Sequence, residues 1–129
     1  MIVVDAAAIV DALTGLQACG ELRDCLADEE LHAPALLDFE LVSALRGLTM
    51  AGRLTEARAN DALTDFEGLP VHRWDAGDAL RRRAYSLREN LNAYDAAYVA
   101  LAEALGCKLV TRDARLARSS GHAVVITVR

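Results

Sequence analysis

The stretch Ile2-Val3-Val4-Asp5 is followed by an alanine-rich segment from Ala6 to Leu13, so that an apolar run, a carboxylate and a helical segment come in direct succession. A continuous apolar run this short is consistent with a buried strand. The same order returns late in the chain, where Lys108 to Thr111 leads to Asp113 and then to a helical turn from Ala114 to Arg118. We therefore expect a strand, an acid and a helix in sequence at both ends of the chain.

Short apolar runs alternate with helical patterns between these two ends. Further strands are predicted at Leu31 to Ala33, Val71 to Arg73 and Val124 to Val128. Further helices are predicted at Glu21 to Ala27, Ala35 to Met50, Thr55 to Phe66, Ala76 or Gly77 to Leu91, and Tyr94 to Leu105. This alternation predicts an α/β domain with a central, mostly parallel sheet. Without a repeat or a linker, residues 1–129 are expected to form a single domain.

The composition is that of a compact protein, with 53% hydrophobic and 26% charged residues. The first residues lack the basic region and cleavage site of a secretory signal, and charges interrupt every apolar stretch before it could span a bilayer. We expect a cytoplasmic protein that does not contact membranes. Three cysteines without a Cys-x-x-Cys pair are expected to be buried, free thiols in a reducing cytosol. The three histidines are far apart in the sequence, and each is expected on the surface or in a loop.

The net charge of −5 argues weakly against nonspecific binding of nucleic acid. Nearly all of the positive charge is arginine, and Lys108 is the only lysine. The planar guanidinium group suits phosphate, so Arg112 and Arg115, which flank Asp113, are predicted to hold a phosphate backbone. The run Arg81-Arg82-Arg83 could be a second contact, although such a run on a helix is more often a solvated face.

Four carboxylates stand in apolar surroundings: Asp5, Glu40, Asp95 and Asp113. Two of them follow the ends of predicted parallel strands, where open sheets bind their ligands. Glu40 is expected in the middle of a helix on its buried face, and Asp95 in the first turn of a helix that is apolar almost all round. Helix capping is an alternative for Asp5 and Asp113, as the helix dipole is for Asp95. If all four side chains lie together in one site, a single function explains why each carboxylate stands in apolar surroundings.

A set of carboxylate oxygens without histidine or cysteine selects hard cations, Mg²⁺ or Mn²⁺. Such ions favour phosphate ligands and promote attack by water at phosphorus. The expected reaction is therefore hydrolysis of a phosphodiester bond.

Four segments resemble the motifs of PIN-domain ribonucleases, specifically the VapC-type toxins of bacterial toxin–antitoxin pairs. They are Ile2 to Ala6, Pro34 to Leu45, Tyr94 to Ala102, and Leu109 to Ala117. The resemblance implies a three-layer α/β/α fold, a homodimer, and RNA cleavage with Mg²⁺ or Mn²⁺ bound by the four acids, with Thr111 supporting them. It also implies inhibition by a VapB-like antitoxin, for which the helices from Leu36 to Phe66 would offer an apolar groove.

Two positions differ from the family's usual pattern. Ala7 and Ser43 stand where the family often has a Ser or Thr and an Asn, respectively. The missing hydroxyl at Ala7 leaves a catalytically weak or silent PIN-like interaction module as an alternative. A phosphorylation-controlled receiver domain is a second rival, but it would carry an adjacent acidic pair after its first strand and a lysine after its last, and both are missing here.

Overall fold

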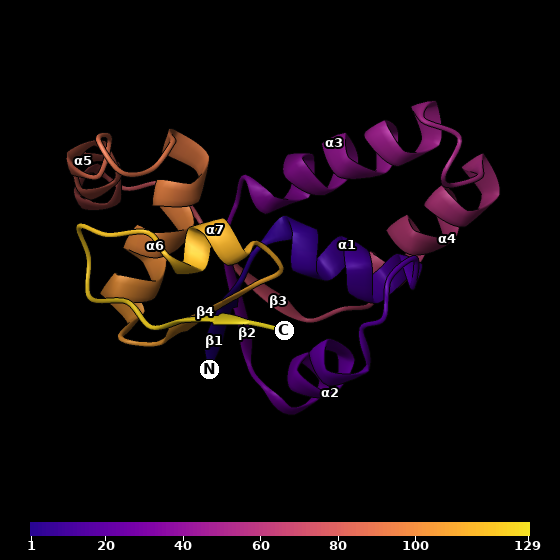
Figure 1. Ribbon diagram of the computed structural model, residues 1–129, viewed down its shortest axis with the longest axis horizontal. Coiled ribbons are helices and arrows are strands. Elements are labelled where there is room, and N and C mark those ends of the chain that lie inside the picture. Colours follow the sequence, from indigo (N-terminus) through magenta and orange to yellow (C-terminus); the bar gives the residue numbers. More distant parts are fainter.

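The computed structural model describes residues 1–129 and contains one five-stranded sheet (Figure 1). The strand order is β3-β2-β1-β4-β5, and every neighbouring pair is parallel. The strands are β1 (Ile2–Val4), β2 (Leu31–Pro34), β3 (Val71–Trp74), β4 (Lys108–Thr111) and β5 (Ile126–Val128). The predicted α/β class with a mostly parallel sheet is confirmed, and the sheet is parallel throughout.

Seven helices cover the sheet. They are α1 (Ala6–Thr14), α2 (Gly20–Asp28), α3 (Leu37–Met50), α4 (Glu56–Glu67), α5 (Asp78–Ser86), α6 (Ala93–Leu105) and α7 (Ala114–Ala117). Helix α1 packs against α2, α3 and α4, whereas α6 packs against α5 and three strands. Figure 1 shows these two groups on opposite sides of the sheet, which gives the three layers expected from the resemblance. None of the helices combines the length and apolar character needed to span a membrane.

Helix α6 forms the centre of the core on its side of the sheet. It contacts β1, β2 and β4, and its residues from Tyr98 to Ala102 are all buried. This burial confirms the expectation from its nearly all-round apolar sequence. Gly106 ends the helix with a φ of +67°, a left-handed conformation that glycine adopts without strain. The chain then turns directly into β4, which occupies the predicted residues.

One predicted helix and the last predicted strand are too long. The helix predicted to reach Leu91 ends at Ser86, because the following residues form separate turns in which Leu87 N–H bonds to Ala84 and Asn90 N–H bonds to Leu87. The last strand begins at Ile126 rather than Val124.

The prediction for the histidines was wrong for His32. This residue lies within β2, is only 5% exposed and stacks on the ring of His72. Sequence spacing could not reveal the contact, because parallel pairing of β2 with β3 brings the two rings together. The three cysteines are free, as expected, but only Cys19 is buried, whereas Cys25 and Cys107 are partly exposed.

Candidate active site

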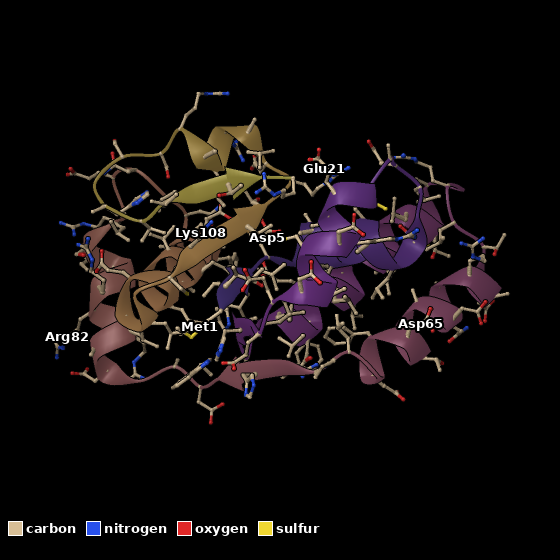
Figure 2. All side chains as sticks on the ribbon, turned by 90° about the horizontal axis from the view of Figure 1, so that it is seen from below. Met1, Asp5, Glu21, Asp65, Arg82 and Lys108 are labelled. Carbon is tan, nitrogen blue, oxygen red and sulfur yellow. The ribbon has the colours of Figure 1, made fainter.

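The strand order reverses beside β1, because the chain first builds β2 and β3 on one side of it and later β4 and β5 on the other. Open parallel sheets bind ligands in the crevice at the carboxyl ends of the strands at such a switch point. Asp5 directly follows β1, and Asp113 comes two residues after the end of β4. Figure 2 shows Asp5 near the middle of the molecule, between its two helical groups.

Asp5 combines two roles in one buried carboxylate. Its Oδ1 accepts a hydrogen bond of 3.0 Å from Ala8 N–H, which caps α1. Its Oδ2 accepts the hydroxyl hydrogen of Thr111. The pKa of Asp5 is raised to about 6, mainly by burial and in smaller part by the nearby charges of Asp95 and Glu40. The two hydrogen bonds oppose this rise without cancelling it.

The hydroxyl of fully buried Thr111 connects the first and the last acid of the site. It donates to Asp5 and accepts from Asp113 N–H at 3.0 Å. Asp113 in turn caps α7, since its Oδ1 accepts from Arg115 N–H at 2.8 Å. The guanidinium of Arg115 lies 3.5 Å from Asp113 Oδ2, and its side chain is 81% exposed. Both acids therefore cap helices, as the alternative interpretation expected, and in each the second oxygen contacts a side chain, Thr111 for Asp5 and Arg115 for Asp113.

Glu40 lies in the first turn of α3, because the helix begins at Leu37 rather than at Ala35. The expectation of a mid-helix position was therefore wrong, and its side chain is half-buried rather than buried. The phenolic O–H of Tyr98 donates to Glu40 Oε1 at 2.7 Å. Burial raises the pKa of Glu40, and the charge of Asp95 adds to the rise, while the Tyr98 hydrogen bond opposes it.

Tyr98 is a site residue that the sequence reasoning missed. It is 2% exposed and lies on α6, three residues after Asp95, so both side chains leave the helix on the same face. Burial and the contact with Glu40 raise the pKa of Tyr98, so the phenol remains a hydrogen-bond donor at neutral pH. The spacing from Asp95 was the only signal in the sequence, and by itself it does not distinguish a core tyrosine from a site residue.

Asp95 completes the set from the first turn of α6, which Asn92 caps through the N–H of Asp95 itself. Burial raises the pKa of Asp95, the charge of Asp113 adds to the rise, and Arg115 opposes it. Repulsion thus links Asp5 with Glu40 and Asp95, and Asp95 with Asp113. The structure brings the four predicted carboxylates into one electrostatically coupled group.

The group is wider than a compact metal cluster. In the whole chain, only Glu30, His32 and His72 bring three ligand atoms within 4.8 Å of one another. The four carboxylates offer oxygen alone, and Arg115 is the only basic side chain that pairs with one of them. Spaced oxygen ligands suit a hard divalent cation that keeps part of its water shell. By the chemistry of its donors, the site therefore fits Mg²⁺ or Mn²⁺.

The two arginines predicted to bind phosphate lie in different environments. Arg112 donates to Asp11 at 2.9 Å and to the carbonyl oxygens of Ala18 and Arg129, and its side chain is 20% exposed. Its guanidinium ties α1 to the end of the chain, and it forms no ion pair with any of the four acids. Arg115 is exposed beside Asp113. This arrangement favours Arg115 over Arg112 as a phosphate contact.

The arginine run on α5 lies away from the four acids. Arg82 pairs with Asp78 of its own helix, and Arg83 pairs with Glu103 of α6. In Figure 2 Arg82 lies at the edge of the molecule, far from Asp5. These ion pairs agree with the interpretation of the run as a solvated face.

An apolar groove of about 460 Å³ lies beside α5 and α6 rather than between α3 and α4. Its walls include Leu36, Leu80, Trp74 and Tyr94. The groove shares only Leu36 with the segment 36–66, so an antitoxin groove formed by that segment stays a prediction. That segment nevertheless exposes three large apolar side chains along α3, namely Phe39, Val42 and Met50.

Comparison with known proteins agrees with this geometry. The PIN domain family model matches residues 2–121. Ribonuclease VapC9 of Mycobacterium tuberculosis is 46% identical over 99% of this chain and 98% of its own length, and Ribonuclease VapC12 of the same species is 39% identical over 95% and 94%. A toxin–antitoxin complex from Klebsiella pneumoniae has the same fold, with a TM-score of 0.69, 17% identity, and coverage of 98% of this chain and 97% of that one. The chain belongs to the PIN-domain family, among its VapC-type toxins.

Proposed function

We propose that this protein is a metal-dependent endoribonuclease toxin that hydrolyses RNA phosphodiester bonds at Asp5, Glu40, Asp95 and Asp113. The observation that carries the proposal is the crowding of four carboxylates at the switch point of the sheet, with raised pKa values for three of them. Groups with perturbed pKa values that gather in a crevice are candidates for catalysis. The relatives named as ribonucleases support RNA as the substrate.

The residues of the chain would hold the reacting groups in place. Asp5 and Asp113 are fixed by their capping bonds and by the hydroxyl of Thr111, and Glu40 is oriented by Tyr98. A bound Mg²⁺ or Mn²⁺ would supply activation of water and stabilisation of the charge that develops on the phosphate. Arg115, exposed at the mouth of the crevice, would pair with a neighbouring phosphate of the RNA.

A VapB-like antitoxin is the partner that this proposal requires. The Klebsiella pneumoniae structure of the same fold is a toxin–antitoxin complex, which supports a partner of this kind. The exposed Phe39 and Val42 of α3 flank Glu40 in the sequence, so an amphipathic segment could cover them and also present a basic side chain to the acids. The proposed location of both the RNA and the antitoxin is the cytoplasm.

We also retain the homodimer that the family resemblance implies. Trp74, Tyr85 and Tyr94 are exposed around the apolar groove, and exposed aromatic residues are enriched at protein interfaces. Sedimentation of the purified chain over a concentration series measures this state directly.

RNA cleavage by purified protein tests the catalytic proposal. We expect chelation with EDTA to stop cleavage, Mg²⁺ or Mn²⁺ to restore it, and Glu40→Gln to abolish it. Glu67→Gln, at an exposed position in α4, is the matched control and should cleave like the parent.

The alternative is a catalytically silent interaction module, which only the Ala7 position favours. Ala7 is exposed in the first turn of α1 and supplies no hydroxyl. An intact protein that binds RNA or an antitoxin, but cleaves no RNA at any Mg²⁺ or Mn²⁺ concentration, would establish this alternative in place of the nuclease.

A further inference from the structure

Three potential ligands gather on the sheet away from the four carboxylates. Glu30 directly precedes β2, so it lies at the opposite end of the strand from the crevice. His32 and His72 are paired residues of β2 and β3, and the alternation of side chains along a strand places Glu30 on their face. The two imidazole rings stack with their centroids 4.7 Å apart, and ligand atoms of all three side chains lie within 4.8 Å of one another.

The hydrogen bonds of His32 define its protonation. The indole N–H of Trp74 can only donate, and it points at His32 Nδ1 at 2.9 Å, so Nδ1 is an acceptor. The ring proton therefore lies on Nε2, which donates to Glu30 Oε1 at 2.6 Å. This contact lowers the pKa of Glu30, so that its carboxylate is ionised at neutral pH. Buried His32 is thus held rigidly, with an anionic oxygen beside one of its nitrogens.

We propose that Glu30, His32 and His72 form a binding site for a borderline transition-metal ion, with Zn²⁺ as its representative. Imidazole nitrogens with one carboxylate oxygen are a ligand set for Zn²⁺, whereas oxygen-only sites suit Mg²⁺ and Mn²⁺. The proposed site therefore differs from the carboxylate crevice in both position and metal class. Neither the nuclease activity nor the antitoxin requires it.

Binding entails a defined change in protonation. For His32 Nε2 to coordinate the ion, its proton must leave that nitrogen, and the neutral ring then carries a proton on Nδ1. Nδ1 can no longer accept from the indole N–H of Trp74, so this hydrogen bond breaks. Glu30 Oε1, released from the Nε2–H donor, becomes a ligand in the same step. Ligation through Nδ1 would displace Trp74 as well, so the state of the indole reports on either binding mode.

The expected consequence is a cross-link between two strands. Strand β3 is at the edge of the sheet, and β2 is its only neighbour. An ion bound by both His32 and His72 would link β3 to β2. It would stabilise the folded state in proportion to the logarithm of the free ion concentration. The end of β2 leads into α3, which carries Glu40. The cross-link would therefore also reduce the mobility of the segment between β2 and α3.

Titration of the metal-free protein with Zn²⁺ alone tests the proposal through Trp74, the only tryptophan in the chain. Zn²⁺ has a filled d shell, so we attribute a change in fluorescence to the altered environment of the indole. We expect a saturable change at one Zn²⁺ per chain. ¹⁵N spectra of the imidazole rings should show shifts for His32 and His72 but not for His122.

Variants separate this site from the other possible ligands. His72 is exposed, so His72→Ala should fold normally and weaken the Trp74 response at least about 10-fold, as should Glu30→Gln. His122→Ala is the matched histidine control, and Glu40→Gln tests independence from the crevice; both should respond like the parent. The proposal would be overturned if Trp74 fluorescence did not change on addition of Zn²⁺, or if His72→Ala gave the same change as the parent. If Glu40→Gln abolishes RNA cleavage but leaves the Zn²⁺ response intact, Zn²⁺ binding is independent of the carboxylate site.

Discussion

Replacing Asp5 by asparagine should stabilise the metal-free protein at neutral pH. Asp5 is only 9% exposed, and the pKa of its carboxyl group rises from 3.8 to about 6 on folding. Each pKa unit corresponds to about 1.4 kcal/mol, so keeping Asp5 ionised in the folded protein costs about 3 kcal/mol above pH 6. Asparagine removes this charge and caps a helix about as well as aspartate.

Part of the gain will be lost at Thr111. Its hydroxyl donates to Asp5 Oδ2, and an amide group at that position cannot preserve both this bond and the cap. A rearranged hydrogen bond costs about 1 kcal/mol. The net expectation for Asp5→Asn is therefore a stabilisation of about 2 kcal/mol at pH 7.5 in EDTA.

The raised pKa of Asp5 also predicts how the stability of the parent changes with pH. Because the folded pKa of Asp5 is above the unfolded value, the folded protein binds more protons between about pH 4 and pH 6. The stability of the parent should fall as pH rises through this window, and Asp5→Asn should lack this component of the fall. At pH 4 the variant should show no advantage, because Asp5 is protonated in the folded parent.

Urea denaturation with EDTA at several pH values measures the difference directly, with Asp61→Asn at an exposed position of α4 as the control. Mn²⁺ should then raise the melting temperature of the parent more than that of Asp5→Asn. A variant that is less stable than the parent at pH 7.5, or that differs from it equally at all pH values, would refute the account of Asp5 as a buried, repelled charge.

Three further predictions concern the neighbours of the site. Tyr98→Phe removes the donor to Glu40, so the acid limb of the pH–rate profile should move to higher pH and cleavage should fall about 10-fold; Tyr85→Phe, which is exposed, should leave both unchanged. Arg112→Ala breaks a partly buried ion pair and two bonds to carbonyl oxygens, so urea denaturation should show a loss of about 2 kcal/mol with RNA affinity retained once the protein is folded. Arg115→Ala should leave stability unchanged but weaken RNA binding and reduce the slope of log K against log salt by about 0.7; an unchanged slope would place the RNA elsewhere.

Local patterns in the sequence were sufficient for the sheet and for the general position of the site. Strand β4 and the helix around Asp95 could be predicted because apolar runs, helical periodicity and a terminal glycine agree there. The start of α3 could not, because Ala35 N–H still bonds to the Trp74 carbonyl and so prolongs the pairing of β2 with β3. This extension moves the start of the helix to Leu37 and puts Glu40 in its first turn.

Contacts between distant segments were beyond the reach of sequence patterns. Arg112 pairs with Asp11 across 101 positions, an engagement of its guanidinium that the sequence did not predict. Tyr98 reaches Glu40 across 58 positions. In both cases the partner depends on how helices pack across the sheet, which neither charge pattern nor periodicity specifies.

Capping by Asp5 and Asp113 is compatible with their proposed catalytic role. Oδ1 accepts from one backbone N–H in Asp5 and from two in Asp113, which fixes each carboxylate against the start of a helix, and Oδ2 contacts a neighbouring side chain. A carboxylate fixed in this way meets a cation with little loss of conformational freedom, which is how a rigid site gains affinity. It follows that alanine and asparagine substitutions report on different things. Alanine removes the cap and the charge together, whereas asparagine keeps the cap and removes the charge, at the cost of one rearranged hydrogen bond to Thr111 in the case of Asp5. The asparagine variants therefore come closer to measuring what the negative charge contributes.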